Sequence, residues 1–209
     1  MIQGVILIDV WQTTEPEINE WYSTVVDKIY TLCKEPYFVN ACYNNCWDYS
    51  ENGYTIPDLS QYNLLRLYHK LDHQGDTPAI IESPNKDIPY SVMNHCRGLN
   101  KTAECFKKLF SKNNSIFLTE STDFAFHCEH YLQNTINHWL VVGKSWHMCL
   151  HYRHMGFNHL KTLDSNNQNF YIDPELCLDE NNQPITEQHI QNDTLNWSSV
   201  SDNLWKLHQ

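Results

Sequence analysis

The sequence has no apolar run approaching the ~20 residues that a helix needs to cross a bilayer, although 41% of its 209 residues are hydrophobic. Its first residues, MIQGVILIDVW, lack the basic stretch that opens a secretory signal peptide, and they reach Asp9 after four apolar residues. They resemble the first core strand of a domain. We therefore expect a globular, cytoplasmic protein with no membrane partner.

Basic residues are scarce. The chain has 14 Lys and Arg against 25 Asp and Glu, and the formal net charge is −11. The basic residues do not cluster, so the chain should repel phosphate backbones. This balance argues against a nucleic-acid partner.

A paired CxxC framework is also missing from the sequence. Eight cysteines lie at positions 33, 42, 46, 96, 105, 128, 149 and 177. A chain of this length does not need disulfides to fold, so we expect reduced thiols. Two groups could be imagined as zinc ligands: Cys42, Cys46 and Asp48, or His127, Cys128 and His130. Neither spacing is a recognised zinc pattern, so we expect no metal and no cofactor.

Short apolar runs predict the strands of a buried sheet. Four are bounded by polar or turn residues: Val5–Ile8, Tyr37–Val39, Ile116–Thr119 and Trp139–Val142. Near-continuous runs of this kind are typical of strands buried on both faces, as in a parallel sheet. Two further strands are expected over His159–Leu163 and Thr194–Ser199.

Helical patterns lie between these runs. Apolar residues recur at helical spacing in Glu17–Lys34 and again from Phe124 to Leu132. A third helix should run from about Cys149 to Met155 and end at Gly156. Tyr62–His69 also looks helical, and a short helix is expected from Asp202. The interval from 166 to 184 reads as a polar loop, with a small hairpin as an option.

Strands that alternate with helices predict an α/β protein with right-handed crossovers. We expect a three-layer α/β/α sandwich with a mainly parallel, roughly six-stranded, Rossmann-like sheet. Residues 1–209 should form a single domain with an elaborated insertion at about 43–112, and part of that insertion could overhang a site.

Three reactive elements follow predicted strands: Asp9, Glu120 and the turn from Gly143 to Cys149. Ligands of open parallel sheets bind beyond the carboxyl ends of the strands. At the start of a helix, Cys149 would be favoured as a thiolate, and nearby amides could stabilise an oxyanion. Asp9 could act as the general base. Singly, such an aspartate is often a cap or loop anchor, and such a cysteine is often part of the core.

These motifs resemble the isochorismatase-like cysteine hydrolases, which include nicotinamidases and other amidases. The resemblance rests on VILIDVWQ, with Asp9 and Gln12, on VVGKSWHMC, where five residues separate Gly143 from Cys149, and on LHYRHMGFNHLKTL. It covers about residues 1–40 and 113–165, with a closing strand near 194–200.

The resemblance implies a triad of Asp, Lys and Cys that acts on a small-molecule substrate, in a homo-oligomer. By position, Asp9 and Cys149 are two members of this triad. It also implies a cis peptide bond at Lys144–Ser145, and an oxyanion hole formed by the amides of Ser145 and Cys149.

The expected lysine is missing. The family places it at the end of the third strand, where this chain reads FLTESTDFAF and offers Thr119 or Glu120 instead. Lys144 is a possible substitute. Two hypotheses stay open: a hydrolase that cleaves an amide or related carbonyl C–N bond through a Cys149 acyl-enzyme, and a catalytically impaired protein of the same fold with a binding, regulatory or assembly role.

Overall fold

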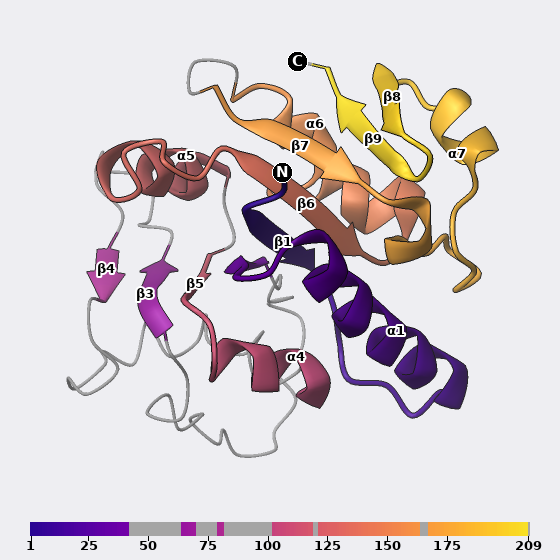
Figure 1. The fold of residues 1–209 in the computed structure, drawn as a ribbon, viewed down its shortest axis with the longest axis horizontal. Coiled ribbons are helices and arrows are strands. Elements are labelled where there is room, and N and C mark those ends of the chain that lie inside the picture. The colour runs from indigo at the N-terminus through magenta and orange to yellow at the C-terminus, as the bar shows by residue number, and fades with distance from the viewer. Residues whose placement is uncertain (42–63, 70–78, 82–101, 119–120, 164–166, 209) are drawn as a thin grey trace.

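The structure is a computed structural model that describes residues 1–41, 64–69, 79–81, 102–118, 121–163 and 167–208. Its described strands form one nine-stranded sheet in the order β4-β3-β5-β2-β1-β6-β7-β9-β8 (Figure 1). Helices pack on this sheet, so the chain is an α/β protein with a mixed, mostly parallel sheet.

The centre of the sheet consists of the four strands that the apolar runs predict. They are β1 (Gly4–Ile8), β2 (Tyr37–Ala41), β5 (Ser115–Phe117) and β6 (His138–Gly143). Together with β3 (Leu64–His69) and β7 (Asn169–Ile172), they form six neighbouring parallel strands. Every residue of β1, β2 and β5 is buried, which explains why their sequences are continuously apolar or nearly so.

The outer strands join this centre through antiparallel pairs. At one edge β4 (Ala79–Ile81) pairs with β3, and at the other β9 (Leu204–Leu207) pairs with β7 and with β8 (Trp197–Ser201). The β8–β9 hairpin lies beside α7 (Glu187–Gln191) at the C-terminal end of the fold (Figure 1).

Helices cover both faces of the sheet. One core contains α1 (Pro16–Leu32) and α4 (Glu104–Phe110), together with the side chains of Val5 and Leu7 from β1. The other contains α5 (Ser121–His130) and α6 (Phe157–Leu160), together with Ile6 and Ile8 from the same strand. Successive β1 side chains alternate between the two cores, as the period of a strand requires.

Several predicted elements are wrong. Residues 159–163 were expected to be a strand, but α6 occupies the beginning of this interval. The expected helix at 62–69 is strand β3, and the expected helix from Asp202 is strand β9. The polar interval 166–184 contains β7, a 3₁₀ helix at Pro174–Leu176 and an isolated bridge from Leu178 to Pro184.

Most of the predicted insertion at 43–112 lies outside the described residues. Within the described ranges, no helix combines the length and apolar character needed to cross a membrane.

Candidate active site

The site begins where β1 and β6 end side by side. These parallel strands pair in register, with Ile8 opposite Gly143. Asp9 follows the first strand and Lys144 follows the second. The main chain at Asp9 is left-handed, with φ of 51°, a conformation that a short polar side chain tolerates better than most. This sharp turn leaves Asp9 only 1% exposed.

Gly143 allows β6 to lie close to β1 at this point. A Cβ atom on Gly143 would lie 2.5 Å from the Ile8 carbonyl oxygen and 2.9 Å from a methyl group of Leu150. Both distances are shorter than Cβ contacts in real proteins, so a larger residue would separate the strand from the helix that follows it. The glycine therefore determines how closely the Cys149 segment approaches β1.

Cys149 lies inside a short helical segment rather than at its beginning. A π-helical turn spans Trp146–Leu150, and it starts three residues before the predicted helix. The amides at its start are already engaged: Trp146 N donates to the Leu178 carbonyl oxygen at 3.0 Å, and His147 N donates to Glu180 Oε1 at 2.6 Å. An anion at this helix start could not use these two donors.

Arg153 joins Asp9 and Cys149, and the sequence interpretation missed it. Its Nε donates to Asp9 Oδ2 at 2.6 Å, and its side chain is 30% exposed. Both charged groups lie close enough to the Cys149 thiol to shift its pKa, Asp9 upward and Arg153 downward. A cation, an acid and a thiol thus meet at one point beyond the ends of β1 and β6.

The spacing of Arg153 was a usable signal. It lies four residues after Cys149, and its amide donates to the Cys149 carbonyl oxygen at 3.3 Å. Residues four apart in a helix share one face. The predicted helix from Cys149 to Met155 therefore already placed an arginine beside the thiol. Arg153 was not predicted as a site residue because the family places its cation at the end of a strand.

The electrostatics of the thiol differ from the sequence-based expectation. Burial raises the pKa of Cys149, the neighbouring Asp9 charge raises it further, and Arg153 offsets only part of the effect. A resting thiolate, expected for a helix start, is therefore not favoured. For Arg153, burial alone would lower the pKa, but Asp9 and Cys149 outweigh burial and raise it. The guanidinium stays charged.

Lys144 is a second cation near this group. It is half-buried, and burial lowers its pKa, while Glu15, Cys149 and Asp9 act in the opposite direction. These interactions place the ammonium group within electrostatic range of the thiol and of Asp9. Arg153, however, is the residue that forms an ion pair with Asp9.

The predicted cis bond at Lys144–Ser145 is wrong, because no peptide bond among the described residues is cis. The chain turns here through Ser145, which is left-handed with φ of 61° and ψ of 73°. A trans bond avoids the ~3–4 kcal/mol cost of a cis non-proline bond. The oxyanion hole assigned to the amides of Ser145 and Cys149 stays a prediction.

The third predicted corner of the site falls on residues that the structure does not describe. Glu120 and Thr119, the candidates for the lysine position, lie outside the described residues. Their strand, β5, is separated from β1 by β2 in the sheet. Gln12, part of the first motif, donates to Glu104 at 3.1 Å in an exposed contact.

A buried pair supports the helix that carries Cys149. His151 Nε2 lies 2.9 Å from Asp193 Oδ2, and the two side chains are 5% and 3% exposed. The other ring nitrogen of His151 contacts the carbonyl oxygen of Trp146, at the beginning of the π-helical turn. Asp193 also accepts hydrogen bonds from Trp197 Nε1 at 2.9 Å and from the Leu195 amide at 3.1 Å.

Other cysteines and histidines are engaged elsewhere. The His127 ring hydrogen-bonds the Tyr37 hydroxyl at 2.8 Å. Cys128 is fully buried in the core, where burial raises its pKa far above the ordinary value. In the part of the chain that the structure describes, no three His, Cys, Asp or Glu side chains form a metal-binding group. Cys42, Cys46 and Asp48 lie outside that part.

Comparison of the chain with models of protein families, with curated proteins and with solved structures found no match. The resemblance to isochorismatase-like hydrolases therefore stays a prediction that rests on the sequence motifs quoted above.

Proposed function

We propose that this protein is an isochorismatase-like cysteine hydrolase that cleaves an amide or related carbonyl C–N bond of a small molecule. Arg153 would take the place of the family's lysine. The observation that carries the proposal is the ion pair of Asp9 and Arg153 beside the Cys149 thiol, beyond the ends of two parallel strands. Under this proposal the fold is a three-layer α/β/α sandwich with a Rossmann-like sheet.

The raised pKa of Cys149 suits a mechanism in which the thiol stays protonated until the substrate arrives. The Cys149 proton passes to Asp9 as the sulfur attacks the carbonyl carbon. Asp9 then returns that proton to the leaving nitrogen as the C–N bond breaks, which leaves a thioester on Cys149. In the second half, Asp9 takes a proton from water and hydroxide attacks the thioester. Asp9 then returns that proton to the Cys149 sulfur as the C–S bond breaks and the carboxylic acid leaves.

Arg153 has an electrostatic role in this scheme. A guanidinium does not lose its proton in proteins, so it cannot shuttle protons as a lysine can. It can hold Asp9 in place, at the observed 2.6 Å, and stabilise the sulfur as negative charge develops on it. Asp9 is then the only proton carrier that the scheme uses.

A second function is favoured by two observations. The pKa of Cys149 is raised, and the turn before it lacks the implied cis bond. Both fit a protein that keeps the fold but serves in binding, regulation or assembly without hydrolysis.

The test is hydrolysis of a panel of small primary amides by the wild type and by Cys149→Ala, with acid release followed by mass spectrometry. The control is Cys105→Ala, because Cys105 is a partly exposed thiol on α4. A hydrolase should lose turnover by at least about a thousandfold without its nucleophile and keep it in the control. Equal turnover in the wild type and in Cys149→Ala would contradict the Cys149 mechanism, and a wild type that hydrolyses no amide above background would favour the binding protein.

A further inference from the structure

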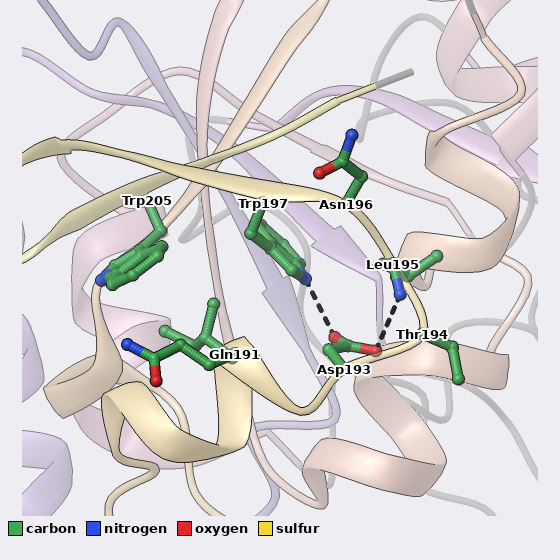
Figure 2. A pocket seen from close by; sticks show the side chains of 8 residues that line it. Gln191, Asp193, Thr194, Leu195, Asn196, Trp197 and Trp205 are labelled. Carbon is green, nitrogen blue, oxygen red and sulfur yellow. Dashed lines mark hydrogen bonds between the residues drawn. The ribbon is translucent and has the colours of Figure 1, made fainter.

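A pocket lies at the C-terminal end of the fold, between α7 and the β8–β9 hairpin. Its volume is about 440 Å³, and its walls include Trp197, Trp205, Gln191, Thr194 and Asn196. Figure 2 shows both indole rings projecting from the strands toward the helix that carries Gln191. This volume is within the ~300–1,000 Å³ range of small-molecule sites.

The strand register places the two tryptophans on the same side of the hairpin. Trp197 pairs with Leu207, and Ser199 pairs with Trp205, so the two tryptophans are diagonal neighbours. Both indoles therefore lie on the face of the hairpin that borders the pocket.

One of these indoles is held in position before any ligand arrives. Trp197 Nε1 donates to Asp193 at 2.9 Å, and its ring centroid lies 5.0 Å from that of Phe157 and 6.0 Å from that of Trp146. A wall that is already ordered loses little conformational entropy on binding.

The charge of the lining favours a cation. Neither Lys nor Arg is among the residues that line the pocket, and Asp193 is. Burial alone would raise the pKa of Asp193, but hydrogen bonds from His151, Trp197 and the Leu195 amide lower it below the usual value. The carboxylate is therefore ionised at neutral pH. Its donors occupy it, so it contributes negative potential to the pocket rather than a free ligand atom.

We propose that this pocket binds a planar, nitrogen-containing aromatic cation that stacks on the indoles of Trp197 and Trp205, with the Gln191 carboxamide beside it. Tryptophan is the side chain that attracts cations most strongly through its ring face. The proposal is independent of the chemistry at Cys149.

The experiment is calorimetric titration of the full chain with N-methylquinolinium, and with the anion quinaldate as the comparison ligand. We expect the cation to bind, and quinaldate to bind at least about tenfold more weakly. Trp205→Leu, which keeps an apolar side chain, should weaken N-methylquinolinium about tenfold. Gln191→Ala should weaken it about threefold, since the carboxamide dipole no longer lies beside the positively charged ring.

The matched control is Gln188→Ala, on the same helix. Gln188 is exposed, bonds Asn192 at 2.8 Å and is not part of the pocket wall. The affinity of the Gln188→Ala protein for N-methylquinolinium should stay within about twofold of the wild-type value, as is usual for surface changes. No binding of N-methylquinolinium, equal binding of quinaldate, or unchanged affinity in both Trp205→Leu and Gln191→Ala would overturn the proposal.

Discussion

At the scale of single residues, the thiol of Cys149 experiences two opposing charges. Asp9 raises its pKa and Arg153 lowers it, while burial adds to the effect of Asp9. The sequence placed Asp9 and Cys149 in one site because both follow apolar strands. It did not reveal the protonation state of the thiol, since burial and the distance to the Asp9 charge depend on the tertiary structure.

Neutralising the two charged neighbours should move the pKa of Cys149 in opposite directions. Asp9→Asn removes a negative charge, so the thiol should ionise at lower pH than in the wild type. Arg153→Ala removes a positive charge, so ionisation should need higher pH. The wild-type midpoint should lie above the ~8.5 of an ordinary cysteine. The measurement is the rate of iodoacetamide labelling against pH, resolved by peptide.

Cys105 is the internal control for this labelling. It is a partly exposed thiol on α4, and its profile should be the same in all three proteins. If the pKa of Cys149 shifts in the same direction in Asp9→Asn and Arg153→Ala, the charges of Asp9 and Arg153 do not act on the thiol as described.

At the scale of elements, the active-site turn depends on a close approach between β6 and β1. Gly143→Ala would place a methyl group against the Ile8 carbonyl oxygen and Leu150. We expect the free energy of unfolding to fall by about 1–3 kcal/mol, the usual cost of overpacking. Urea denaturation measures it.

A matched substitution on the surface should lower the free energy of unfolding by less than Gly143→Ala does. Val200 lies on the edge strand β8 and is 49% exposed, so Val200→Ala should change the free energy of unfolding by no more than about 0.5 kcal/mol. If Gly143→Ala is as mild as Val200→Ala, the close approach does not constrain the turn.

The central strands could be predicted because they are buried on both sides, which gives each a nearly continuous apolar run. The outer strands could not. β9 has the sequence LWKL, which is short and partly exposed, and it becomes a strand only by pairing with β7 and β8. Conversely, FNHL forms the short helix α6 although a strand was expected from His159. In such short segments tertiary pairing outweighs local preference.

At the scale of the whole molecule, the His151–Asp193 pair connects the segment between α7 and β8 to the helix that carries Cys149. When one partner of a buried pair is removed, the other is left as a buried charge or polar group with no interaction to offset its loss of water. Asp193→Ala should therefore lower the free energy of unfolding at neutral pH by about 3–5 kcal/mol. The exposed pair of Lys107 and Glu104 is the control, since Glu104→Ala should cost at most about 1 kcal/mol.

Acid should remove the stabilisation that Asp193 provides. The folded-state pKa of Asp193 is lowered, so its contribution is present in full above the ordinary value of ~3.9 and is lost as the pH falls through the lowered value. The stability difference between the wild type and Asp193→Ala should shrink below about pH 4. A difference that stays constant down to pH 2 would mean that the ionised carboxylate is not its source.

The homo-oligomeric state, the cytoplasmic location and the single domain stay predictions at this scale. They rest on the resemblance, on composition and on chain length, respectively.

The most direct test of the central claim is detection of an acyl group on Cys149. Wild-type protein would be mixed with p-nitrophenyl acetate as a reactive acyl donor, quenched in acid and digested for mass spectrometry, with Arg153→Ala treated in parallel. The account predicts an acetyl group on the Cys149 peptide that forms quickly in the wild type and more slowly in the variant. Acetylation confined to other residues, or an equal rate in the two proteins, would contradict it.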